Sequence, residues 1–250
     1  MAEDKKGLSR RDFLKTTGVA TGAVIGGGLI GGLVGYNVKK TPAGPGKEAG
    51  KGSGHGEVNT RGRMFFTTSN EFNVLSEAVE RIFPEDELGS GAIGLGVPYF
   101  IDNQLAGNYG SNAKEYMQGP FFAGESTQGY QSRLTRAEIF RQGIAKMDEE
   151  AQKRFETGFV KLDGDQMDEI ITAFQKNEVD MKGVASEFYF KLLRQATLEG
   201  AYADPIYNGN INMEGWRMKG FPGHQMEYFV DIDSEQYMEI EPQSMSSMDH

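Results

Sequence analysis

Apolar residues recur every three or four positions from Thr68 onward, and this periodicity restricts the fold more than any other feature of the chain. The first such stretch begins with Thr68 and Glu71, which have the spacing of a capping box at a helix N-terminus. It stops at Pro84, because proline lacks the backbone N–H group that a helix interior requires. The pattern therefore predicts a first helix that runs to Phe83.

The same pattern predicts four more helices. They are expected at 97–105 with Gly107 as the end, from the capping box Thr135–Glu138, from Asp165–Asp168, and at about 184–198 with Gly200 as the terminator. No stretch alternates clearly between apolar and polar residues. We therefore expect a mainly α fold, a small helical domain with two long glycine- and aromatic-rich loops at 108–130 and 200–223. The rings of the first loop are expected to pack it into an ordered structure.

The residue content excludes several kinds of redox and metal site. The chain has no cysteine, so disulfides, thiolate zinc sites, thiolate iron–sulfur clusters and covalent haem attachment are ruled out. It has three histidines, His55, His224 and His250, and no two of them have helical ligand spacing. We therefore predict no catalytic, cofactor-binding or metal-binding residue in this chain.

Two acidic clusters have alternative interpretations. Residues 163–168 resemble the start of a calcium loop, but the glycine and the acidic twelfth residue that such a loop needs are missing, which favours a helix cap. Residues 85–87 are three consecutive acids, and their side chains would point in different directions in a turn. A solvated turn is therefore favoured over an acid–base pair.

The charge distribution argues against nucleic-acid binding. Residues 1–40 hold seven basic and three acidic residues, which leaves 19 basic and 33 acidic residues in 41–250, a net charge of −14. Such an acidic body repels a phosphate backbone.

The N-terminus resembles a twin-arginine export signal. Its defining residues are Ser9, Arg10, Arg11, Phe13 and Leu14, and an apolar, glycine-rich stretch follows from about residue 18 to 36. The resemblance implies export by the twin-arginine translocase to the extracytoplasmic face of the cell membrane. Small-residue cleavage sites are absent after the apolar stretch, and residues 17–38 are long enough to span a bilayer. Residues 1–40 are therefore either a removed signal or a retained membrane anchor.

Composition divides the rest of the chain into three parts. Residues 41–63 are rich in glycine, lysine, proline and serine and are expected to form a flexible linker. The helical domain is expected at 64–230. Residues 231–250 form an acidic tail, which we interpret as a partly disordered extension.

The second loop resembles the gluconate 2-dehydrogenase subunit 3 family. The residues that carry the resemblance are Asp204, Pro205, Tyr207, Gly209, Asn210, Gly215, Trp216, Gly220, Phe221, Pro222 and Gly223. Residues 82–84, 100–107 and 119–121 are also similar to the family. Asn208 replaces a usual glycine, but asparagine tolerates a left-handed backbone, so the turn is expected to form. Ile211 replaces a usual basic residue.

The resemblance implies a small, non-catalytic subunit that escorts a flavin-dependent catalytic subunit of the glucose-methanol-choline oxidoreductase type through the export channel. FAD, and haem in a cytochrome c subunit, would then be carried by partner subunits. The candidate partner interface is Asp204, Pro205, Tyr207, Asn210, Trp216, Phe221 and Pro222. The alternative is that the rings of Tyr207, Trp216 and Phe221 pack the core of this domain.

Two other functions remain open from the sequence. The chain could be an exported enzyme that acts alone through an unrecognised site. It could instead be a membrane-anchored extracytoplasmic interaction protein without a redox partner, which the anchor-like N-terminus and the linker would suit.

Overall fold

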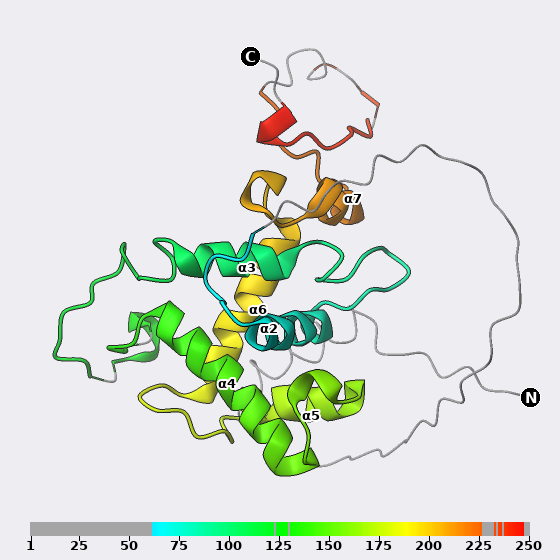
Figure 1. The fold of residues 1–250 in the computed structure, drawn as a ribbon. Coiled ribbons are helices and arrows are strands. Elements are labelled where there is room, and N and C mark those ends of the chain that lie inside the picture. The colour runs from blue at the N-terminus through cyan, green and yellow to red at the C-terminus, as the bar shows by residue number, and fades with distance from the viewer. Residues whose placement is uncertain are drawn as a thin grey trace, which may run out of the picture.

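Helix α2 (Ser69–Ile82) packs against α3, α4, α5 and α6 and lies between them in the fold (Figure 1). The computed structural model describes residues 62–122, 124–129, 131–226, 233, 235–236 and 238–247. The other helices are α3 (Val97–Ala106), α4 (Arg136–Phe155), α5 (Gly164–Gln175), α6 (Ser186–Tyr202) and α7 (Glu214–Lys219). The 3₁₀ turns are η1 (Ser126–Gln128), η2 (Phe159–Lys161), η3 (Pro205–Tyr207), η4 (Ile211–Met213) and η5 (Met245–Ser247).

The predicted mainly α fold is confirmed, since the described residues form helices and 3₁₀ turns but no strand. None of these helices has the length and the hydrophobicity that a membrane span requires. The predicted signal or anchor at 1–40 lies outside the described residues, and so does all of the predicted linker except residues 62 and 63.

The centre of the core is the ring of Tyr189 on α6. Phe140 of α4 and Phe174 of α5 contact this ring edge to face, with centroids 5.6 and 5.4 Å away. Tyr189 is completely buried, and burial raises the pKa of its hydroxyl group. Farther out, Arg81 of α2 donates two hydrogen bonds, of 2.8 and 2.6 Å, to Asp168 of α5. Apolar packing and this ion pair together join α2, α4, α5 and α6.

Side-chain caps determine where three of the helices begin. The capping boxes predicted at Thr68 and Thr135 are both present. The predicted start of α5 at Asp165 is wrong, because the capping residue is Asp163, whose carboxylate accepts a hydrogen bond of 2.9 Å from the N–H group of Gln166. The residues 163–168 therefore cap a helix, as the sequence favoured over a calcium loop.

Gly200 does not terminate a helix, and that prediction is wrong. Helix α6 continues to Tyr202 and leaves the helical conformation at Ala203. Gly200 lies instead where α6 crosses α3, and a Cβ atom at this position would be 2.8 Å from the ring of Phe100. The glycine thus permits close contact between two helices, a role that a one-dimensional pattern does not distinguish from a helix end.

The loop between α3 and α4 begins at Gly107, the predicted end of α3, and its described rings pack only in part as expected. Tyr109 is half-buried beneath the guanidinium of Arg136, which lies 4.7 Å from the ring centroid. Burial raises the pKa of the Tyr109 hydroxyl to about 12. In contrast, Tyr116 is 81% exposed and Phe122 is 74% exposed. Two of the four described rings of this loop, those of Tyr116 and Phe122, therefore face solvent.

The buried carboxylate of Asp102 on α3 fixes the segment that leads into α2. It accepts hydrogen bonds from three successive backbone N–H groups, at 2.5 Å from Met64, 3.2 Å from Phe65 and 2.8 Å from Phe66. Phe65 and Phe66 are thereby held in the core, where their rings meet edge to face. The Asp102 side chain thus joins the first described segment to α3.

Replacing Asp102 by alanine should lower the free energy of unfolding by about 3 kcal/mol, because three N–H groups lose a charged acceptor. For a domain of this size, the melting temperature would fall by roughly 6–12 °C in a thermal unfolding experiment. The exposed Asp180 provides a control, since its replacement by alanine should change stability by no more than about 0.5 kcal/mol. Equal melting temperatures for the two variants would contradict this role.

Candidate functional site

The candidate site is built on the C-terminal end of α6, where the last backbone carbonyl groups have no partner within the helix. The indole N–H group of Trp216 donates a hydrogen bond of 2.7 Å to the carbonyl oxygen of Tyr202. The side-chain amide of Asn210 donates one of 2.9 Å to the carbonyl oxygen of Ala203. Two side chains of the 200–223 loop therefore supply hydrogen-bond donors to the C-terminal end of the helix that precedes the loop.

Asn210 also organises the loop itself. Its side-chain oxygen accepts a hydrogen bond of 2.8 Å from the N–H group of Gly215 at the start of α7, and its backbone is left-handed with φ of 47°. A side chain at Gly215 would collide with the carbonyl oxygen of Ala201, so glycine allows α7 to approach the end of α6. The predicted left-handed turn at Asn208 is confirmed, with φ of 68°.

The aromatic residues of the loop divide between its interior and its surface. Trp216 is 5% exposed, and the ring of Phe221 packs against it edge to face at 5.4 Å. Phe221 is itself 48% exposed and Tyr207 is 52% exposed. The alternative of packing within the domain thus holds for Trp216, whereas Tyr207 and Phe221 retain surface for a partner.

Part of the predicted acidic tail packs against the same loop. The N–H group of Gln243 donates to the carbonyl oxygen of Pro222 at 3.1 Å, and the N–H group of His224 donates to that of Gln243 at 2.7 Å. Ser244 is 3% exposed. In Figure 1 this segment, drawn in red, lies beyond α7 at the end of the molecule that is remote from α4 and α5. Residues 241–247 therefore return to the domain instead of extending away from it.

Asp204 holds this returning segment. Its carboxylate accepts hydrogen bonds from the N–H group of Ile206 at 3.0 Å, the hydroxyl of Ser244 at 2.7 Å and the N–H group of Met245 at 2.9 Å. Partial burial acts to raise the pKa of this carboxyl, but the three hydrogen bonds and the nearby His224 outweigh it and hold the pKa below its ordinary value. Asp204 is therefore held as a carboxylate that joins η3 to the C-terminal segment.

The predicted interface residues are thus brought together, but not all on one surface. Asn210 and Trp216 are buried, and Asp204, Pro205 and Pro222 are half-buried. Tyr207 and Phe221 are exposed. Direct contact between a partner and these two residues remains a prediction.

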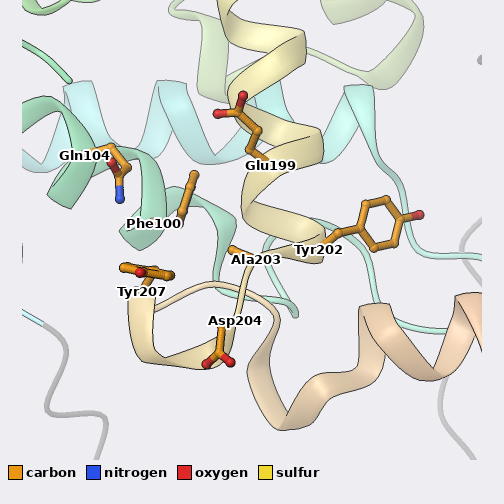
Figure 2. A pocket seen from close by; sticks show the side chains of 7 residues that line it. All are labelled: Phe100, Gln104, Glu199, Tyr202, Ala203, Asp204 and Tyr207. Carbon is orange, nitrogen blue, oxygen red and sulfur yellow. The ribbon is translucent and has the colours of Figure 1, made fainter. Parts of the chain in front are cut away.

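An open groove of about 520 Å³ lies between α3, the last turn of α6 and η3. It is lined by Phe100, Gln104, Glu199, Tyr202, Ala203, Asp204 and Tyr207. Figure 2 shows the rings of Phe100 and Tyr207 close to Gln104, with the carboxylate of Glu199 on the adjoining turn of α6 and the ring of Tyr202 directed away. Sequence reasoning missed Gln104 and Glu199, because they come together only when α3 crosses α6.

The other acidic residues and His224 have local contacts. Asp86 accepts a hydrogen bond of 2.9 Å from the N–H group of Leu88 and bridges to Gly89, which confirms that residues 85–87 begin a turn. A ring nitrogen of His224 lies 3.0 Å from the sulfur of Met226. Within the described residues, no three acidic or histidine side chains are grouped as a metal site would require.

A family model described as gluconate 2-dehydrogenase subunit 3 matches residues 69–223, from the first residue of α2 to the end of the loop. The chain belongs to this family. A second model, the TAT (twin-arginine translocation) pathway signal sequence, matches residues 7–27, which include Arg10 and Arg11. The signal supports export across the membrane. Among curated proteins and among solved structures, nothing matches the chain.

The part of the chain that matches the family includes the loop residues that bond the end of α6. The family match ends at Gly223, and its last part contains the residues that complete α6. These residues therefore support the family fold directly, whatever surface the loop presents to other proteins.

Replacing Asn210 by alanine should lower the free energy of unfolding by about 3 kcal/mol, because Gly215 and Ala203 lose their hydrogen-bond partners and alanine disfavours a left-handed backbone. Replacing Asn208 by alanine is the matched control. It carries the same backbone cost, roughly 1–2 kcal/mol, but no side-chain hydrogen bond of Asn208 to the described residues is lost. Denaturant unfolding would measure both, and equal losses would show that the hydrogen bonds of Asn210 contribute nothing.

The Asp204 contact should depend on pH. Because its pKa is lowered in the folded protein, its contribution to stability is complete well above the ordinary pKa of about 4 and is lost as pH falls through the lowered value. The Asp204→Asn variant should melt below the native protein at about pH 7, and this difference should shrink at about pH 3. The exposed Asp233, replaced by asparagine, should melt like the native protein at both values. A difference that grows on acidification would refute the assignment.

Proposed function

We propose that this chain is the non-catalytic small subunit of an exported, flavin-dependent dehydrogenase complex of the gluconate type, acting on a sugar or polyol. In this proposal it is needed for export, assembly and stability of the catalytic subunit. The observation that carries the proposal is that one chain combines a twin-arginine signal at 7–27 with the subunit 3 domain at 69–223.

The contacts of the domain support an accessory role. The buried carboxylate of Asp102 holds the segment at 64–66, the Asp204 carboxylate holds the C-terminal segment, and Asp168 binds Arg81. Each of these acids is engaged in holding structural elements together. We therefore assign the redox chemistry to partners, a flavoprotein of the glucose-methanol-choline oxidoreductase type that carries FAD and a cytochrome c subunit that carries haem.

In this proposal, the export signal directs the whole complex to the twin-arginine translocase. The twin-arginine translocase moves folded proteins, so a flavoprotein that had already bound its cofactor would cross the membrane while attached to this chain. The complex would then reside at the extracytoplasmic face of the membrane. The N-terminus of this chain would remain there as an anchor if the signal is retained.

Replacing Arg10 and Arg11 together by lysine tests the proposal, because it keeps the charge but removes the paired arginines of the signal. We expect both this chain and the flavin-containing subunit to remain in the cytoplasm, with dehydrogenase activity lost from the extracytoplasmic fraction. Cell fractionation and flavin absorbance of the affinity-purified chain would measure this. The matched control replaces Lys5 and Lys6 by arginine and should export normally.

Two outcomes would count against the proposal. Continued export of the flavoprotein by the Arg10 and Arg11 variant would show that this chain does not escort it. A native chain that purifies without a flavin spectrum and without a larger second chain would favour the extracytoplasmic interaction protein instead.

A further inference from the structure

We propose that the groove between α3, the end of α6 and η3 receives a segment of the flavin-carrying catalytic subunit in which an apolar side chain lies next to a lysine or arginine. This inference rests on the proposed function and names the surface and the chemistry of that contact. It is argued from the lining of the groove, its charge and its rigidity.

The lining of the groove supplies the apolar part of the contact. Phe100 of α3 is 7% exposed and forms part of the floor beside Ala203, while Tyr207 stands at the edge with 52% of its surface exposed (Figure 2). Ile206, next to Tyr207, is also 52% exposed. Tyrosine at the edge of an apolar depression is a frequent anchor point in protein interfaces, because it adds a large area at low conformational cost.

The shape of the groove favours a protein segment over a small molecule. Sites for small molecules enclose most of the ligand, whereas this groove is open to solvent along one side. Its volume of about 520 Å³ is sufficient for one or two large side chains of a segment whose backbone stays outside. A protruding side chain of a partner protein fits these limits.

The charge of the groove determines which segment fits. Glu199 is exposed at its edge, and its carboxylate accepts a hydrogen bond of 2.7 Å from the amide of Gln195. Within the described residues, no lysine, arginine or histidine forms an ion pair with Glu199. Asp204, the other acid of the groove, is held by Ser244 and Met245. A lysine or arginine of the partner could therefore pair with the Glu199 carboxylate without first breaking an ion pair within this chain.

The groove is also held rigid before any partner arrives. Its η3 wall follows directly from α6, and Asn210 and Trp216 bind the carbonyl groups at the end of that helix. Asp204 fixes η3 by accepting a hydrogen bond from the N–H group of Ile206. A preformed site loses little conformational entropy on binding, which favours a stable complex.

The first test measures the dissociation constant between the full-length chain and the purified flavin-containing subunit that accompanies it. We expect Tyr207→Ala to weaken binding by roughly 30-fold. Glu199→Lys should weaken binding about as much, and Glu199→Gln by a few-fold. For the native pair the affinity should fall as salt rises, and this dependence should be reduced in Glu199→Gln.

The controls lie outside the groove. Tyr116→Ala removes a more exposed aromatic ring, and Glu178→Lys reverses an exposed charge beyond the end of α5. Both should bind like the native chain, and melting temperatures would confirm that every variant is folded. Because Glu199 is exposed, its variants test the groove even if Tyr207→Ala is unstable.

The absence of cysteine from the chain provides a second test, since one introduced thiol can be labelled uniquely. Ile206→Cys carrying a benzophenone probe should crosslink to the flavin-containing subunit on illumination. The same probe at Lys114→Cys, on the loop after α3, should not. Crosslinking from position 114 but not 206 would place the partner on that loop instead.

The outcomes separate this inference from the proposed function. If the native chain binds no flavoprotein, both fail. If the native chain binds one and the Tyr207 and Glu199 variants bind equally well, the escort function stands and the assignment of this groove is overturned.

Discussion

The fold depends on how the end of α6 is completed. A helix leaves its last carbonyl groups without internal partners, and at the half-buried end of α6 Trp216 and Asn210 donate hydrogen bonds to the carbonyl groups of Tyr202 and Ala203. To do so, the chain must turn back on itself, which requires the left-handed residues Asn208 and Asn210 and the close approach at Gly215. The unusual composition of the 200–223 loop follows from this single requirement, because few residue types satisfy it.

A comparable contact operates where the described structure begins. Asp102 accepts hydrogen bonds from the N–H groups of residues 64–66. Asp204 likewise accepts them from the N–H groups of Ile206 and Met245 and from the Ser244 hydroxyl. In both places one carboxylate on or beside a helix holds a segment through its backbone N–H groups, and at 65–66 the buried rings of that segment add apolar packing. Apolar packing around Tyr189 brings the helices together, and these polar contacts attach the connecting segments to them.

The loop residues that stabilise the fold are largely different from those that remain exposed to a partner. The residues by which the loop resembles its family are largely committed to the fold, since Asn210 and Trp216 are buried. Surface for recognition remains at Tyr207, Ile206 and the groove beside them, which the buried residues hold in place. For the escort role that we propose, such a stable, preformed surface matters more than reactive groups.

The sequence by itself determined the helical class, two capping boxes, the end of α3 and the family, because these depend on neighbours within a few residues or on a contiguous motif. It also indicated the export signal. Only the tertiary structure decided that Gly200 lies where α6 crosses α3 and that Trp216 is buried while Tyr207 is exposed. It also showed that the segment at 241–247 packs against the 200–223 loop. It also decided that Phe100, Glu199 and Tyr207 form one groove. Each of these depends on residues far apart in the chain, whose proximity is set by packing in three dimensions and leaves no periodic trace in the sequence.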